Sequence, residues 1–218
     1  MKDDLLDEIL QDNRPFKEED EILGPLLEEI DLIDDPNIMS FVRAVLIKAP
    51  SYFWTVPSDF VDHHHPPDES KEGGLVLHTK RVVRFAREMT AAQDRGQEEL
   101  DLITAAALIH DITKATPLPD GSYIYDSMHP YTVDTIVRWV RQEDKGKDES
   151  HSSSLWISEE DMNTILRMVR CHKGSWSPVP ETIPVTSLEL TLHLADLLAS
   201  KLHIMLDGDM IKEGRWSE

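Results

Sequence analysis

The chain has 218 residues, 40% hydrophobic and 6% aromatic, so it can bury one sizeable and mostly aliphatic core. Its 42 acidic and 22 basic side chains give a formal net charge of −20, which repels the phosphates of long nucleic acids. No apolar run reaches the roughly 18 residues that a membrane span needs. The acidic start and the single cysteine, Cys171, predict a cytoplasmic protein without an intrachain disulfide.

Residues 1–35 are predicted to form an acidic helical extension. They contain 14 acidic and 3 basic residues, a net charge of −11. Leucine and isoleucine recur at helical spacing over residues 4–11 and 18–33, and Pro15 and Pro25 interrupt the pattern. We expect a solvated appendage, and the alternative is a surface for a basic partner or for self-association. Residues 36–218 are predicted to form one helical domain, with its motif-bearing core at about 73–203.

Apolar spacing and capping signals predict the helices of this domain. Asp35 and Pro36 resemble an N-cap and a first-turn proline, followed by a helix to about residue 48. Further helices are expected after Gly74, over 98–114, over 131–143, over 159–171 and from 187 to about 206. The intervening segments are rich in proline and glycine, and we predict no strand and no internal repeat. The expected fold class is therefore all-α.

Histidines and aspartates at predicted helix positions form a candidate metal site. His110 and Asp111 follow the apolar run 105–109, and burying an unpartnered carboxylate there would cost several kcal/mol. A bound cation removes that cost, and it would do the same for Asp196, which has apolar neighbours too. The candidate ligands are His78, His110, Asp111, His129, His172 and Asp196. Ligands from several helices are typical of metal sites in helical proteins, and this mixture suits Mn, Fe, Co, Ni or Zn, with Mg also allowed.

The order of these residues resembles the HD superfamily of metal-dependent phosphohydrolases. The family's Gly-Gly-Leu-x-x-His-Thr opening is matched by residues 73–79, its Leu-x-His-Asp-x-x-Lys element by residues 107–114 and its closing Ala-Asp helix by residues 194–201. The resemblance implies a helical bundle in which one ion is held by His78, His110, Asp111 and Asp196. It also places Asp111 where it could bridge to a second ion.

Two further histidines suggest the binuclear subtype of this family. His129 and His172 lie between the His-Asp pair and the final aspartate, as that subtype requires. Without a metal, His129 would be an ordinary residue at a helix start and His172 a helix C-terminal cap. Residues 171–176 also resemble the His-His-Gly element of HD-type 3′-to-5′ exoribonucleases, with Cys171 in place of the first histidine. Trp176 in this element is either a loop anchor or a stacking partner for a base.

The resemblance implies hydrolysis of a phosphate ester by a water bound to one or two divalent ions. We expect the substrate to be a nucleotide or a similar small phosphorylated compound, with Asp111 and Lys114 as catalytic candidates. The candidate substrate contacts are Lys114, Lys173, Lys201 and His65. The alternatives are a 3′-5′ exonuclease on short RNA or DNA, a nucleotide-sensing module without turnover and, more remotely, a di-iron oxygenase. Homo-oligomerisation and the choice between mono- and diesterase activity stay open.

Overall fold

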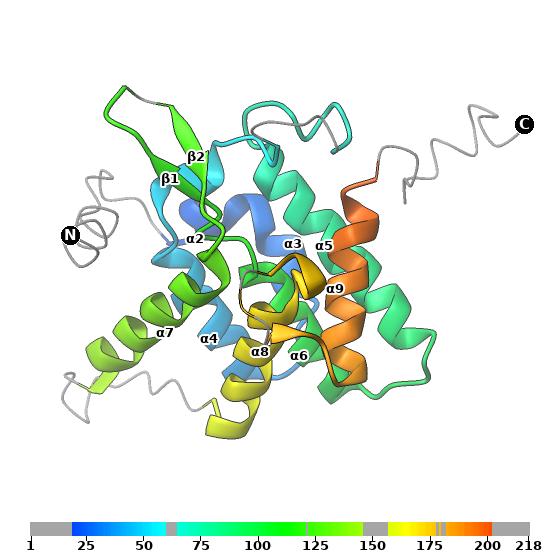
Figure 1. The fold of residues 1–218 in the computed structure, drawn as a ribbon. Helices are drawn as coiled ribbons and strands as arrows, with labels where there is room; N and C mark the ends of the chain where they lie inside the picture. Colours follow the sequence, from blue (N-terminus) through cyan, green and yellow to red (C-terminus); the bar gives the residue numbers. More distant parts are fainter. Residues whose placement is uncertain are drawn as a thin grey trace, which may run out of the picture.

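The structure, a computed structural model, describes residues 19–59, 65–120, 122–145, 157–177, 179 and 182–201. Helices dominate it, so the predicted all-α class is confirmed (Figure 1). The elements are, in chain order, α2 (Glu19–Leu23), the 3-10 helix η1 (Gly24–Leu26), α3 (Leu27–Ile30), α4 (Pro36–Ile47), the 3-10 helix η2 (Ser51–Trp54), α5 (Gly74–Ala91), α6 (Gln97–Ile109), β1 (Ala115–Pro117), β2 (Tyr123–Tyr125), α7 (His129–Lys145), α8 (Glu159–Cys171), the 3-10 helix η3 (Gly174–Trp176) and α9 (Ser187–Ala199).

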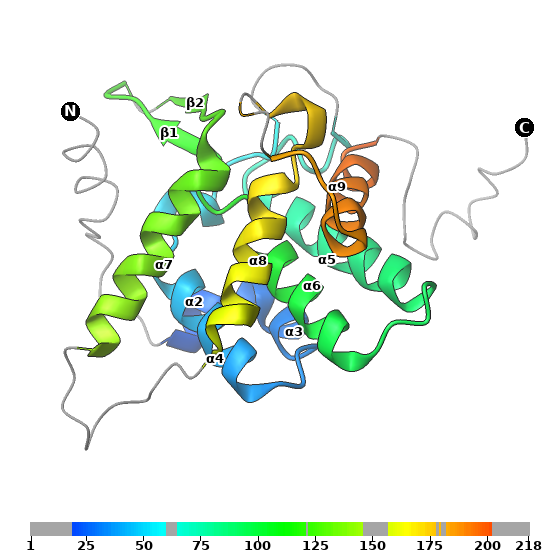
Figure 2. The same ribbon diagram turned by 60° about the horizontal axis from the view of Figure 1, so that its bottom comes forward.

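Helix α6 is the centre of the bundle. It contacts α3, α4, α5, α8 and α9. All of its residues from Asp101 to Ile109 are buried, as expected for a helix that is largely apolar around its whole circumference. Helices α5 and α9 lie side by side against it in both ribbon views (Figures 1 and 2). Among the described residues, no helix combines the length and apolar character needed to cross a membrane.

The described part of the predicted acidic extension packs into the same core. Leu23, Leu26 and Ile30 of the first short helices are fully buried, and Ile33 is nearly so. The carboxylate of Asp35 accepts hydrogen bonds from the N–H groups of the first turn of α4, as an N-cap does. Residues 1–18 lie outside the described residues, and the division at residue 35 stays a prediction.

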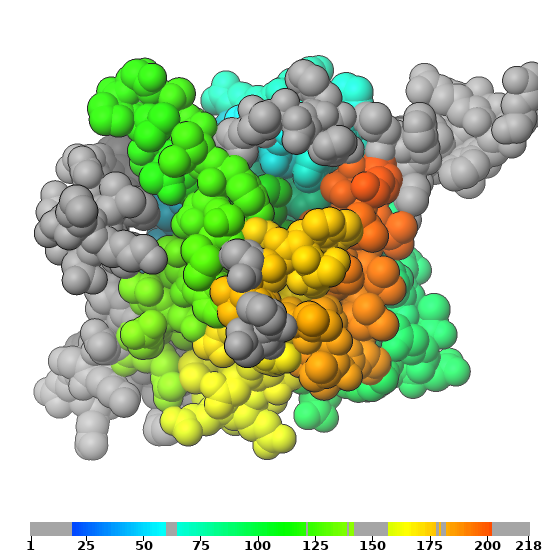
Figure 3. All heavy atoms as spheres, viewed as in Figure 1, coloured from blue at the N-terminus to red at the C-terminus, as the bar shows by residue number. Residues whose placement is uncertain are grey.

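The segment predicted as a loop after the His-Asp pair contains a β-hairpin instead. Strands β1 and β2 pair antiparallel, with Ala115 opposite Tyr125 and Pro117 opposite Tyr123. Each strand has only three residues, too few for an alternating pattern to be recognised in the sequence. The hairpin projects from the helical body in the ribbon and space-filling views (Figures 1 and 3).

Several helix ends differ from the predicted ones, and the differences place the candidate ligands at the ends. Helix α6 stops at Ile109, so His110 is its C-cap and Asp111 lies in the following turn. Helix α7 begins at His129 itself, and Asp196 occupies the last turn of α9, whose described helical residues end at Ala199. No glycine or proline marks the end of α6, so the apolar run concealed it.

Asp101 ties the turn before α4 to the central helix. It is 2% exposed, and its carboxylate accepts the N–H groups of Asp34 at 3.1 Å and Asp35 at 2.8 Å, together with the Gln97 amide at 2.7 Å. Asp101→Ala leaves these donors unpaired, so we expect unfolding in urea to show a loss of about 1–3 kcal/mol. Asp101→Asn keeps one acceptor oxygen and should lose less. Equal stability of the alanine variant and the wild type would contradict this assignment.

Candidate metal centre

The six predicted ligands lie close together although they span more than a hundred positions of the chain. Five helices position them, either within the helix or at one of its ends. They are His78 in the second turn of α5, His110 and Asp111 at the end of α6, His129 at the start of α7, His172 at the C-cap of α8 and Asp196 in the last turn of α9.

Two imidazoles and two carboxylates form the first donor set. His78 Nε2 lies 3.0 Å from Asp196 Oδ1 and 3.8 Å from Asp111 Oδ2. His110 Nε2 lies 3.4 Å from the same Asp111 oxygen and 4.0 Å from Asp196 Oδ1. These four side chains therefore face a common point, as the ligands of one ion would.

A second donor set lies on the other side of Asp111. His129 Nε2 is 2.8 Å and His172 Nε2 is 3.6 Å from Asp111 Oδ1, and the two imidazole nitrogens are 3.2 Å apart. Asp111 thus directs Oδ2 to the first set and Oδ1 to the second. One carboxylate shared in this way is suited to bridging two ions.

Three of the four histidines are oriented by the main chain. Nδ1 of His110, His129 and His172 lies 2.7, 2.7 and 2.6 Å from the backbone carbonyl oxygen three residues earlier. A proton on each Nδ1 donates to that carbonyl, which leaves the lone pair of Nε2 directed at the centre. Metal-binding histidines are commonly held by such a hydrogen bond on the other ring nitrogen.

The donor atoms fit a divalent metal. Nε2 of His110 is buried and, among the described residues, meets no hydrogen-bond partner, as expected of an atom placed to coordinate an ion. Burial and the neighbouring His110 lower the pKa of His172 to about 3, so its imidazole is neutral at physiological pH and ready to coordinate. Burial alone would raise the pKa of Asp111, but Lys114 and His110 hold it well below its usual value.

A cavity of about 160 Å³ opens onto the second donor set. Its lining residues are Asp111, Lys114, Tyr125, His129, His172, Lys173, Trp176 and Asp196. Lys114 Nζ donates to Asp111 Oδ2 at 2.8 Å and is almost buried. Lys173 Nζ donates to the Ser127 carbonyl at 2.9 Å and lies 4.9 Å from the centre of the Tyr125 ring. The cavity therefore combines the ligands with two cations.

Of the four candidate substrate contacts, two line the cavity and two lie outside it. Lys114 and Lys173 line the cavity, whereas Lys201 is exposed beyond α9 and His65 packs on Glu69 and His78. Neither Lys201 nor His65 is among the cavity's lining residues. All four roles stay predictions.

Two residues near the centre were missed by sequence reasoning. Tyr125 reaches the cavity only because of the hairpin, which no sequence pattern announced. Glu69, which contacts His78, lies in a polar loop where nothing distinguishes it from the other acidic residues nearby.

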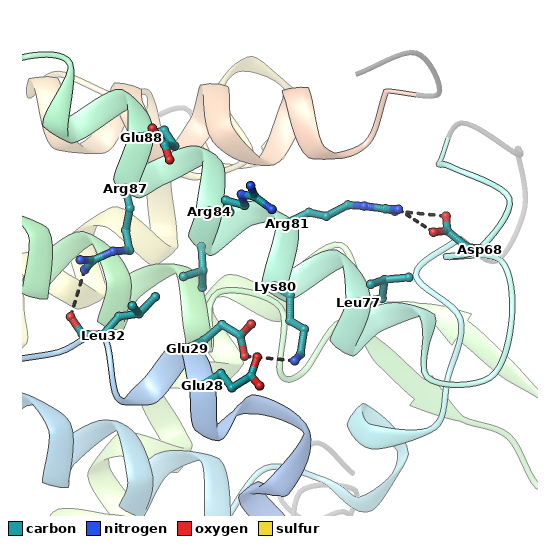
Figure 4. Close-up of a pocket in the computed structure, with 11 residues that line it drawn as sticks. Glu28, Glu29, Leu32, Asp68, Leu77, Lys80, Arg81, Arg84, Arg87 and Glu88 are labelled. Atoms are coloured by element: carbon teal, nitrogen blue, oxygen red, sulfur yellow. Dashed lines mark hydrogen bonds and ion pairs between the residues drawn. The ribbon is translucent and has the colours of Figure 1, made fainter. Parts of the chain in front are cut away.

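A larger cavity of about 530 Å³ lies between α5 and the first short helices (Figure 4). Its charged lining consists of Lys80, Arg81, Arg84, Arg87, Glu28, Glu29, Asp68 and Glu88. Four cations thus lie among four carboxylates, so the cavity offers little net attraction to an anion. None of the candidate metal ligands lines it.

Cys171 precedes a candidate ligand but has no reactive environment. Its side chain is fully buried, and burial together with the neighbouring Glu189 raises the pKa of its thiol to about 11. We expect a disulfide reagent at pH 7.5 to leave this thiol unmodified in the folded protein and to label it fully in denaturant. Rapid labelling of the folded protein would contradict its burial.

Comparison with known proteins identifies relatives of the whole described bundle. A family model described as the HD domain matches residues 75–201, more than half of the chain. The chain is 25% identical over 212 residues to the 3′-5′ exoribonuclease YhaM of Geobacillus sp. (strain WCH70), an alignment that covers 94% of this chain and 59% of that protein.

Two further relatives carry the same name. The 3′-5′ exoribonuclease YhaM of Oceanobacillus iheyensis is 25% identical over 92% of this chain and 60% of its own length. That of Listeria monocytogenes serotype 4b (strain CLIP80459) is 24% identical over 85% of this chain and 56% of its own length. The chain thus spans less than two thirds of the curated relatives it matches. No solved structure gives a significant match.

Proposed function

The chain belongs to the HD domain family, and we propose that it is a metal-dependent phosphohydrolase acting on the phosphate ester of a nucleotide-type substrate. The observation that carries this proposal is the position of Asp111, whose two oxygens face the two donor sets. If each donor set held an ion, Asp111 would contribute an oxygen to both, and the pair would stabilise the attacking and the leaving oxygen of a phosphoryl transfer.

The side chains around the cavity have distinct tasks in this proposal. The six ligands would hold one or two divalent ions, which would supply a water whose pKa is lowered from about 15.7 towards 7. Lys114 places an ammonium group at the floor of the cavity, where it counters the negative charge that develops on the phosphoryl oxygens. Lys173, held by the Ser127 carbonyl, gives a second positive charge at the cavity wall and attracts the anionic substrate into an otherwise acidic protein.

Exposed aromatic rings support a base-bearing substrate. Trp176 is 63% and Tyr125 is 42% exposed, and both line the cavity. The Trp176 ring centre lies 5.6 Å from that of His193, so a half-buried neighbour supports the indole while much of its surface stays open. A base can stack on such a ring, a contact worth about 1–3 kcal/mol.

A 3′-5′ exonuclease acting on short RNA is the second candidate. The activity after which the three relatives are named supports it, as does the resemblance of residues 171–176 to the exoribonuclease element. The net charge of −20 opposes binding of long nucleic acid, so a short oligonucleotide suits the chain better.

Hydrolysis assays separate the candidates. Protein reconstituted with Mn, Co, Ni, Fe or Mg is incubated with a nucleotide panel, bis(p-nitrophenyl) phosphate and a 5′-labelled short oligoribonucleotide. Release of phosphate from nucleotides supports the first candidate, and a ladder that shortens from the 3′ end supports the second. No turnover with any metal, matched by an equally inert Asp111→Ala variant, would overturn both. A nucleotide that raises the melting temperature but stays intact would favour a sensing module.

Substitution of Trp176 tests the stacking role. Trp176→Ala should raise the KM for a base-bearing substrate by about tenfold, the equivalent of 1.4 kcal/mol, and change kcat little. Trp176→Phe retains an aromatic ring and should show a smaller effect. Steady-state kinetics on matched oligonucleotides with and without the terminal base provide the control. An equal loss on the abasic substrate would contradict stacking.

A further inference from the structure

His78 differs from the other three histidines in how its second ring nitrogen is held. It lies in the second turn of α5, where the Leu75 carbonyl three residues earlier is already engaged, because it accepts the Thr79 hydroxyl at 2.9 Å. Its Nδ1 therefore cannot use the carbonyl that orients each of the others. Instead, Nδ1 makes an ion-pair contact of 3.2 Å with Oε2 of Glu69, which does not meet hydrogen-bond geometry, while Nε2 faces the donor set.

The carboxylate of Glu69 is completely buried and held from several directions. His65 Nδ1 lies 2.7 Å and the Ser58 hydroxyl 3.1 Å from Oε2, and the Arg81 guanidinium donates to Oε1. A buried carboxylate is stable only when paired and hydrogen-bonded in this way. The position of the charge is therefore fixed by contacts from two loop residues and one residue of α5.

The backbone of Glu69 is fixed as firmly as its side chain. Its carbonyl oxygen accepts the N–H of Ser58 at 2.9 Å. It also lies so close to Gly74 that a Cβ at that position would come within 1.8 Å of it. The glycine at the start of α5 thus allows the loop to press against the helix that carries His78.

His65, Glu69 and His78 bring three possible ligand atoms together, which raises the question of another metal site. Arg81 argues against it, because its guanidinium already occupies Oε1 of Glu69 and would repel a cation. Figure 4 shows the same side chain extending from α5 to Asp68. The cluster has a paired, satisfied charge and is better suited to holding a side chain than to binding an ion.

We propose that Glu69 is the positioning residue for the metal ligand His78, accepting the proton on Nδ1 so that the lone pair of Nε2 stays directed at the ion. Ser58, His65 and Arg81 hold the carboxylate in place for this purpose. The inference rests on the metal-binding part of the proposed function and is independent of the substrate.

Metal affinity tests the inference without any need for turnover. We expect Glu69→Ala to raise the Kd for Mn²⁺ or Co²⁺ by about 10–100-fold, measured by titration calorimetry. Glu69→Gln keeps an oxygen that can accept from Nδ1 and should lose less. Asp68→Asn is the matched control, because Asp68 also pairs with Arg81 but is half-exposed and has no described contact with His78. Its Kd should stay within about twofold of the wild type.

NMR of the wild type keeps the test decisive if a variant does not fold. In the Zn²⁺-loaded protein labelled with ¹⁵N-histidine, His78 should carry its proton on Nδ1 and coordinate through Nε2. Coordination through Nδ1, or folded Glu69→Ala and Glu69→Gln with wild-type affinity, would overturn the inference. If the wild type binds metal as expected yet hydrolyses none of the substrates, the proposed function fails while the role of Glu69 stands.

Discussion

Asp111→Asn is expected to lower kcat/KM by more than about 10³-fold. The side chain faces both donor sets, so the change removes a negative charge from two places at once. An amide nitrogen in place of one oxygen also cannot coordinate, so the proposed bridge between two ions would be lost.

Kinetics and metal analysis together check this expectation. Plasma mass spectrometry of the purified variant should show fewer ions per chain than the wild type. Asp120→Asn, which makes the same change in charge at an exposed site, is the control and should keep wild-type activity and metal content. Full metal occupancy in Asp111→Asn would contradict the bridging role.

Lys114→Met should lower kcat by about 10²–10³-fold while leaving metal bound. The ammonium group lies 2.8 Å from Asp111 Oδ2, and it borders the cavity where a phosphoryl group would react. Its removal leaves the ligands in place but takes away a charge that would stabilise the transition state more than the ground state.

The comparison of kcat with metal content separates this role from a structural one. Lys71→Met removes an equal charge from an exposed loop position and should behave as the wild type. Loss of metal from Lys114→Met would show that the lysine supports the site itself, and unchanged kcat would exclude a role in the reaction.

The sequence predicted most of the helical architecture because the apolar residues recur at helical spacing and the caps are explicit. Helix α8 has the predicted range, and α9 begins at Ser187 as predicted, after a capping box formed by Thr186 and Glu189. The six side chains named as candidate ligands also lie close together, as the resemblance to the HD family implied, and their role as ligands stays a prediction.

Features that depend on contacts between segments far apart in the sequence could not be predicted. The hairpin is too short for a periodic signal, and the end of α6 is hidden within an apolar run. Glu69 acquires its importance only because Gly74 lets its loop lie against α5, a contact that no local pattern encodes. The burial of Leu23 and Ile30 likewise depends on neighbours elsewhere in the chain.

The carbonyl groups that orient His110, His129 and His172 belong to the main chain. Substituting the side chains of the residues that carry these carbonyls therefore leaves the acceptors in place. Mutations at these three supporting positions can therefore be tolerated without loss of the hydrogen bonds that orient the imidazoles. The imidazole of His78 depends on the side chain of Glu69 instead, so a single missense mutation at that position would remove its support.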